Sequence, residues 1–247
     1  MQVSIISDIH VRDNFCEGGN FLYKFLDEAK SRGDTEIILL GDIFDFMVGS
    51  YPEYQKKFSR LFQKIEDTLS EKITIHYVEG NHDFHIKNLF EEYFQSYDHF
   101  KFHLGPFALE VNGIDYLFCH GDEIELNNIP HHMFRGLVKS RFAQHVMLKL
   151  INHKYLANLG NFLSEKSRSY GERQQTPQIL EKIKQNSRKS AVAFAKKNKF
   201  SRIICGHSHI KDLVEIDNVL YANNGFAIRE KTFISLKHKD VLFEKLI

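Results

Sequence analysis

The chain has 247 residues, of which 43% are hydrophobic and 26% are charged, and its formal net charge is +1. This length is enough for one domain with a full core, and the composition excludes disordered and fibrous proteins. There is no apolar run of about 18 residues, and the chain enters a strand at once without an apolar signal segment, so we expect a cytoplasmic location.

The first part of the chain alternates strands with amphipathic helices. Buried strands are predicted over Gln2–Ser7, Glu36–Leu40 and Ile73–Val78. Apolar side chains at helical spacing predict helices over Phe21–Ala29, Glu53–Leu69 and Lys87–Gln95. This alternation predicts parallel strands joined by right-handed crossovers.

The later part of the chain is rich in strands. Asn112-Gly113 is a strong turn signal and predicts a hairpin of Phe107–Val111 with Ile114–Cys119. Further strands are predicted over Arg202–Cys205, Leu213–Ile216, Val219–Ala222, Thr232–Leu236 and Val241–Glu244. We therefore predict one α/β domain, 1–247, with two β-sheets packed face to face and flanked by helices.

Residues 127–199 form a basic, apolar helical insertion within this predicted domain. They hold 15 Lys and Arg against 3 Asp and Glu, a balance of +12, whereas the remainder holds 18 against 29, a balance of −11. Thr176-Pro177 is a good start for the last helix of this segment. On charge alone, a solvated helical face is the simpler explanation, and an anionic partner is the alternative.

Polar side chains follow five of the predicted strands at the point where each strand ends. They are Asp8 and His10, then Asp42, then Asn81, His82 and Asp83, then His120, and finally His207 and His209. One such motif is weak, because an aspartate after a strand often only begins a loop or caps a helix. Five together, all at strand exits where α/β sheets bind ligands, predict a single site.

Seven of these residues are nitrogen or oxygen donors suited to metals: Asp8, His10, Asp42, Asn81, His120, His207 and His209. A structural zinc site needs only four ligands, usually with cysteine, so seven donors fit two metals about 3.5–4 Å apart that share a carboxylate. We expect two divalent ions, manganese first, with iron or zinc as alternatives. Such a pair activates water and neutralises phosphoryl oxygens, which indicates metal-assisted phosphoester hydrolysis.

The motifs resemble those of the calcineurin-like metallophosphoesterase superfamily: DxH at Asp8–His10, GDxxD at 41–45, GNHD at 80–83, a later His120 and GHxH at 206–209. The resemblance implies a double β-sandwich flanked by helices. It implies that one metal binds Asp8, His10, Asp42 and His209, and the other Asp42, Asn81, His120 and His207. It also implies that His82 protonates the leaving oxygen or stabilises the transition state and that Asp83 orients His82.

A closer resemblance is to the UDP-2,3-diacylglucosamine hydrolases of lipid A biosynthesis, through GDIFDFMVG, GNHDF, HGDE and the basic insertion. In that family the insertion is a lid that holds acyl chains. The resemblance implies an amphiphilic nucleotide-lipid substrate and peripheral contact with an anionic membrane on its cytoplasmic face. The implied substrate-binding residues are Arg135, Lys139, Phe142, Lys166, Ser167 and Arg168.

The predicted reaction is hydrolysis of UDP-2,3-diacylglucosamine to UMP and 2,3-diacylglucosamine 1-phosphate. His82 stands where that family carries arginine in GNRD, so the substrate stays open. The alternatives are a phosphodiesterase or phosphatase of soluble nucleotides, a nuclease with steep salt dependence, and a metal-free scaffold. We do not expect a nucleic acid partner, because nucleic acid offers nothing for the apolar stripes of the insertion to bury.

Overall fold

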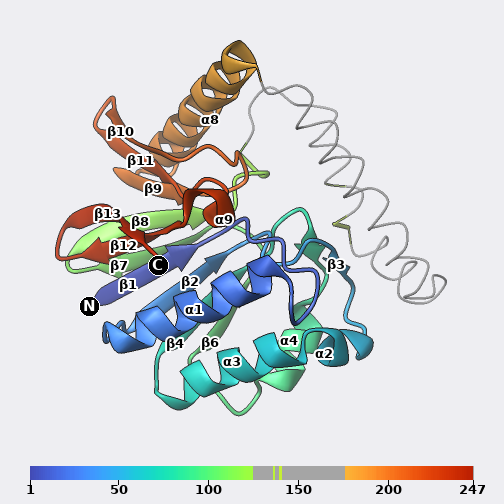
Figure 1. Cartoon of the computed structure of the whole chain (residues 1–247). Helices are drawn as coiled ribbons and strands as arrows, with labels where there is room; N and C mark the ends of the chain where they lie inside the picture. The colour runs from blue at the N-terminus through green and yellow to red at the C-terminus, as the bar shows by residue number, and fades with distance from the viewer. Residues whose placement is uncertain (125–135, 137–138, 141–175, 247) are drawn as a thin grey trace.

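The computed structural model describes residues 1–124, 136, 139–140 and 176–246, and Figure 1 shows their arrangement. A six-stranded sheet has the order β13-β12-β1-β2-β4-β6. Its strands span, in that order, Asp240–Lys245, Thr232–Lys237, Gln2–Ile6, Glu36–Leu40, Thr74–Val78 and Phe100–His103. A five-stranded sheet has the order β10-β11-β9-β8-β7. Its strands span Asp212–Ile216, Val219–Asn223, Arg202–Cys205, Ile114–Cys119 and Phe107–Val111.

The predicted strand–helix alternation is confirmed in the first sheet. β1, β2, β4 and β6 run parallel, and β12 and β13 close one edge in antiparallel pairing. The helices are α1 Glu17–Ser31, α2 Glu53–Lys57, α3 Ser59–Ser70, α4 Lys87–Tyr93, α8 Pro177–Lys197 and α9 Ala227–Glu230. A two-stranded sheet, β3 Met47–Val48 with β5 Asp83–Phe84, lies beyond the carboxyl ends of β2 and β4.

The structure has four layers because side chains alternate in direction along each strand. Ile37 and Leu39 of β2 pack against the helical layer that contains α1 and α3, whereas Ile38 and Leu40 face the second sheet. The outer face of the second sheet is covered by Ala191, Val192 and Ala195 of α8. Full burial of each of the larger aliphatic side chains stabilises the folded state by roughly 1.5–3 kcal/mol. The predicted pair of packed sheets flanked by helices is therefore confirmed.

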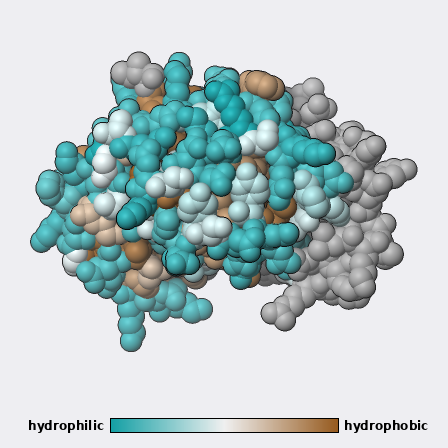
Figure 2. All heavy atoms as spheres, turned by 90° about the horizontal axis from the view of Figure 1, so that it is seen from below, coloured by the Kyte–Doolittle hydropathy of each residue, from teal (hydrophilic) through white to brown (hydrophobic). Residues whose placement is uncertain are grey.

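The solvent face of the helical layer is mostly hydrophilic (Figure 2). Its helices are amphipathic, and the residues that they bury, such as Phe25, Leu26, Phe62 and Ile65, all belong to the core beneath the first sheet. Among the described residues, no helix is both long and apolar enough to cross a membrane.

Two local predictions differ from the structure. The helix predicted over Glu53–Leu69 is divided at Phe58, whose backbone leaves the helical region (φ −116°, ψ 25°) while its buried ring packs against Phe44 at 4.5 Å. Strand β6 was not predicted, because as an edge strand it is only half-buried and lacks a clear apolar pattern. In both places tertiary packing overrides the local signal.

The end of the predicted insertion lies on the sandwich. Thr176 caps α8 by accepting a hydrogen bond from the backbone of Ile179, as the sequence predicts. The C-terminal half of α8 then packs against β9 and β11 and forms the fourth layer. Residues 125–135, 137–138 and 141–175 lie outside the described residues, so the division into body and insertion stays a prediction.

Candidate metal centre

The loops that leave the strands use an uncommon backbone conformation. Asp8, His10, Asp42, His207 and His209 all have φ between 52° and 68°. Residues other than glycine adopt this left-handed region rarely and at some cost, and such residues cluster at functional sites. Here the conformation turns the chain sharply at three strand exits. The backbone amides of Asp8 and Ile9 donate to the carbonyls of Gly41 and Asp42, which ties the first two exits together.

The first group of donors is formed by the exits of β1, β2 and β9. Donor atoms of Asp8, His10, Asp42 and His209 all lie within 4.8 Å of one another. His209 Nε2 is 3.2 Å from Asp8 Oδ1 and 3.2 Å from His10 Nε2. Although burial opposes ionisation of Asp8, its contact with His209 lowers the pKa of this carboxyl.

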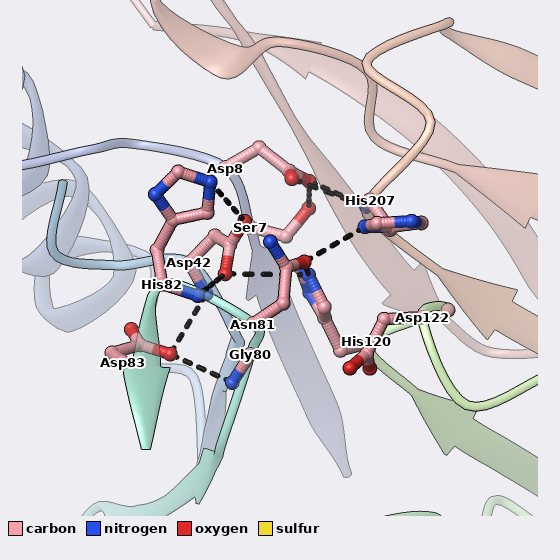
Figure 3. A network of polar contacts seen from close by, with 12 residues as sticks. Ser7, Asp8, Asp42, Gly80, Asn81, His82, Asp83, His120, Asp122 and His207 are labelled. Atoms are coloured by element: carbon pink, nitrogen blue, oxygen red, sulfur yellow. Dashed lines mark hydrogen bonds and ion pairs between the residues drawn. The ribbon is translucent and has the colours of Figure 1, made fainter. Parts of the chain in front are cut away.

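The second group shares Asp42 with the first. Donor atoms of Asp42, His120 and His207 lie within 4.8 Å of one another. Asn81 Oδ1 lies between the two rings, 3.1 Å from His120 Nε2 and 2.9 Å from His207 Nδ1 (Figure 3). The structure therefore brings the seven donors predicted from the sequence close together.

The protonation of these side chains suits divalent cations. His120 Nδ1 is 3.0 Å from the carbonyl oxygen of Leu40. Since a carbonyl only accepts, Nδ1 donates this hydrogen bond, and Nε2, which faces Asp42 and Asn81, is left as the ring atom that could bind a metal. His10 and His209 also present Nε2 atoms to one another, an arrangement that a cation between neutral rings satisfies. The residues present fit two divalent cations.

Asp42 is buried yet ionised. Burial opposes its charge, but the nearby rings of His120 and His82 hold its pKa well below the usual range. In return, although burial lowers the pKa of His120, the Asp42 carboxylate raises it well above the ordinary value. A carboxylate that is charged at neutral pH and common to both groups is what a bridging ligand requires.

His82 and Asp83 lie beside the centre, with different contacts. His82 Nδ1 is 2.7 Å from the backbone carbonyl of Asp45, and its ring centroid is 4.9 Å from that of His10. Asp83 instead accepts hydrogen bonds from the amides of Gly80 and Ile43 and from Tyr77, at 2.7 Å each. The orienting contact expected from Asp83 is thus made by Asp45, and Asp83 holds the exits of β2 and β4 together.

Two glycines allow the strand exits to approach one another. A Cβ at Gly206 would meet Asp8 Oδ2 at 2.5 Å and Ser7 Oγ at 2.6 Å. A Cβ at Gly80 would collide with the carboxylate of Asp42. The glycines of the GNHD and GHxH motifs are therefore required by close packing around the donors.

Some residues around the centre were not predicted. Phe226 stacks on His209 with ring centroids 5.4 Å apart and lies 6.1 Å from the ring of His10, and nothing in the sequence pattern singles it out. Asp45 lies 3.8 Å from His10 Nδ1, and its place in GDxxD could have indicated a role. Asp122 is fully buried next to His120 in the HGDE segment.

Of the predicted substrate-binding residues, the structure describes Lys139. Its Nζ is 3.5 Å from Asp122 Oδ2 and 5.8 Å from the centre of the Phe84 ring. This places Lys139 beside the metal centre. Arg135, Phe142, Lys166, Ser167 and Arg168 lie outside the described residues, so their roles stay predictions.

Comparisons with known proteins agree with this geometry. A UDP-2,3-diacylglucosamine hydrolase of Neisseria gonorrhoeae is 28% identical over 152 residues, which covers 59% of this chain and 58% of the relative. The chain therefore spans less than two thirds of that relative. A UDP-2,3-diacylglucosamine hydrolase of Shewanella halifaxensis is 22% identical over 220 residues, 88% of this chain and 86% of the relative.

Structural and family comparisons also cover most of the chain. A solved archaeal phosphodiesterase has the same fold, with a TM-score of 0.51 and 14% identity over 99% of both chains. The calcineurin-like phosphoesterase family model matches residues 1–211, a range that includes every donor described above. The chain belongs to the calcineurin-like phosphoesterase family.

Proposed function

We propose that this protein is a two-metal pyrophosphate hydrolase that cleaves UDP-2,3-diacylglucosamine to UMP and 2,3-diacylglucosamine 1-phosphate. The observation that carries the proposal is the sharing of Asp42 between two groups of donors, each within 4.8 Å. One group is Asp8, His10, Asp42 and His209, and the other is Asp42, His120 and His207. Asn81 Oδ1 joins the second group through its contacts with His120 and His207. We expect manganese, with iron or zinc as alternatives.

When bound, the two cations supply an activated water and positive charge for the phosphoryl oxygens. The chain itself supplies the proton. His82 Nδ1 is occupied by the carbonyl of Asp45, so Nε2 is the atom that transfers a proton to the leaving oxygen. A positioned acid of this kind contributes about 10²–10⁴-fold to the rate. Asp83 acts indirectly, because its hydrogen bonds hold the loops that carry Asp42 and His82.

The identity of the substrate is supported by the curated relatives, which are named as hydrolases of UDP-2,3-diacylglucosamine. It is also supported by the composition of 127–199, which joins large apolar residues with a balance of +12. We propose that Phe142 and its apolar neighbours hold acyl chains, and that Arg135, Lys139, Lys166, Ser167 and Arg168 hold phosphate oxygens. The same basic segment would attach the protein to the anionic cytoplasmic face of a membrane.

A direct assay tests this proposal against its main alternative. Purified protein with manganese is offered UDP-2,3-diacylglucosamine and, separately, bis(p-nitrophenyl) phosphate and a soluble nucleotide diester. We expect a kcat/KM for the lipid nucleotide at least about 100-fold above that for either soluble substrate. Preference for the soluble nucleotide would instead favour a nucleotide phosphodiesterase, which the His82 of GNHD is compatible with. If none of the three substrates is hydrolysed, the proposed activity is wrong and only the membership of the family remains.

A further inference from the structure

The His10 side of the metal centre has an aromatic wall. The ring of Phe226 stacks on His209 at an interplanar angle of 19° and a centroid distance of 5.4 Å. It also contacts the ring of His10 at 6.1 Å. Phe226 is only partly buried, so the same side chain that covers two of the proposed ligands also borders solvent. A flat ring at the edge of a phosphoester site is a surface on which a nucleobase can stack.

Two arginines lie on the same side. Arg229 Nη2 donates to the backbone carbonyl of His209 at 2.9 Å, and 51% of this side chain is exposed. Arg12, 61% exposed, has Nε 3.9 Å from Asp45 Oδ2, and Asp45 Oδ1 is 3.8 Å from His10 Nδ1. A guanidinium carries five N–H donors, so each arginine is anchored next to a proposed ligand and still presents donors to solvent.

The His120 side of the centre has the opposite character among the described residues. Asp122 is fully buried there, and Glu123, the next residue, is partly buried. Lys139 is engaged by Asp122 at 3.5 Å. On the His10 side, Arg12 pairs with Asp45 and Arg229 pairs with Glu230 at 3.1 Å, and both guanidinium groups keep exposed donors that an anionic group arriving from solvent can meet.

The described residues that border the predicted lid differ in position from those that carry Phe226 and Arg229. The segment that carries the predicted acyl-binding residues begins after Ile124, which follows the exit of β8, and ends at Thr176, which caps α8. Both attachment points belong to the five-stranded half of the sandwich (Figure 1). Phe226 and Arg229 instead follow β11 and lead into β12, the strand that pairs with β1 of the six-stranded sheet.

We propose that Phe226, Arg229 and Arg12 form the subsite for a nucleoside monophosphate, with the base on Phe226 and the phosphate between the two guanidinium groups. This inference rests on the proposed function, because it takes up the UMP half of that substrate. It assigns recognition to three residues that the sequence motifs do not include.

The test uses the manganese-loaded protein and competitive inhibition of bis(p-nitrophenyl) phosphate hydrolysis. The probes are UMP, ribose 5-phosphate and inorganic phosphate. In the wild-type protein we expect UMP to bind about tenfold or more tightly than ribose 5-phosphate, which lacks the base. In Phe226→Ala that advantage should disappear. Because it is a ratio within one protein, a change in metal content affects both inhibitors alike.

The arginines are tested with Arg12→Gln/Arg229→Gln. We expect the ratio of the Ki of UMP to that of inorganic phosphate to rise about tenfold or more. Arg60→Gln, an exposed arginine of α3 that contacts Asn20 and Tyr23 rather than the centre, is the matched control and should leave the ratio unchanged. Ratios in the Phe226 and double-arginine variants equal to those of the wild type would overturn the subsite, as would a wild type that binds UMP no better than phosphate.

Turnover of UDP-2,3-diacylglucosamine by the wild-type protein is measured in parallel. If the lipid nucleotide is hydrolysed but the inhibition ratios do not change, the subsite is wrong and the proposed function stands. If the lipid nucleotide is not hydrolysed but the ratios change as expected, the subsite stands and the lipid substrate is wrong.

Discussion

At the scale of single residues, the chemistry of the centre depends on two histidine rings whose Nδ1–H groups donate hydrogen bonds to backbone carbonyls. The Leu40 carbonyl sets the tautomer of His120, and the Asp45 carbonyl does the same for His82. Both rings therefore direct Nε2 towards Asp42, at 3.4 Å from Oδ1 and 3.9 Å from Oδ2 respectively. The difference in function follows from the surroundings: His120 is fully buried among other donors, while His82 lies at the partly exposed edge.

Asp42→Ala should remove both metals and nearly all activity, because both donor groups use this carboxylate. The measurement is metal content per chain by mass spectrometry, together with kcat on a generic phosphodiester. Asp115→Ala, an exposed carboxylate of β8, is the matched control and should keep two metals. Two tightly bound metals in Asp42→Ala would show that this residue is no bridge.

His82→Ala should keep its metals and lose roughly 10²–10⁴-fold in kcat, the usual contribution of a positioned acid. Its ring contacts the Asp45 carbonyl and the edge of His10; its donor atom lies within 4.8 Å of those of His10 and Asp45, outside the two groups that share Asp42. Metal content and kcat are measured on the same preparation. Loss of metal in parallel with rate would make His82 a ligand instead.

At the scale of elements, the centre is made by strand exits that pack more closely than side chains normally allow. Left-handed residues turn each exit inward, and Gly80 and Gly206 make room for the carboxylates of Asp42 and Asp8. Asp83 then binds the amides of the β2 exit to the GNHD loop. This rigid arrangement positions the donors before any ligand binds, which is how a catalytic metal site keeps its geometry.

Gly206→Ala should weaken metal binding about 10–100-fold, the range seen when the support of metal ligands is disturbed. The new methyl group would meet Asp8 Oδ2 at 2.5 Å and Ser7 Oγ at 2.6 Å, and would displace the Asp8 carboxylate. Metal titration and thermal unfolding are measured together. Gly105→Ala is the control, since a Cβ there meets nothing within 4 Å. Unchanged metal affinity in Gly206→Ala would show that metal binding does not depend on the space this glycine leaves beside Asp8.

At the scale of the whole molecule, charge divides into an acidic body and a basic segment, −11 and +12. The described body has a compact four-layer sandwich whose helical layer shows a mostly hydrophilic outer face (Figure 2). The sequence of 134–163 in the predicted insertion is rich in large apolar residues. The proposed lipid substrate is tested at this segment, because a soluble nucleotide offers no acyl chain for its apolar residues to bury.

Phe142→Asp should lower turnover of the lipid nucleotide at least about tenfold, while hydrolysis of bis(p-nitrophenyl) phosphate changes less than about twofold. Each buried CH₂ of an acyl chain contributes about 0.8 kcal/mol, so loss of a few contacts is enough. Phe142→Leu keeps an apolar surface and should behave like the wild type. An equal loss on both substrates would indicate that Phe142 serves to pack the predicted insertion onto the body and does not bind acyl chains.

The sequence by itself determined the donors and their grouping at strand exits, because a strand, its end and the residues that follow are all local features. It also determined the two-sheet architecture, through apolar periodicity and the Asn112-Gly113 turn. Only the tertiary structure decided which groups orient the donors. The contact of His82 with Asp45 joins residues 37 apart, and that of Phe226 with His10 joins two ends of the chain. Likewise the break at Phe58 and the edge strand β6 follow from packing against Phe44 and β4, and no local pattern contains that information.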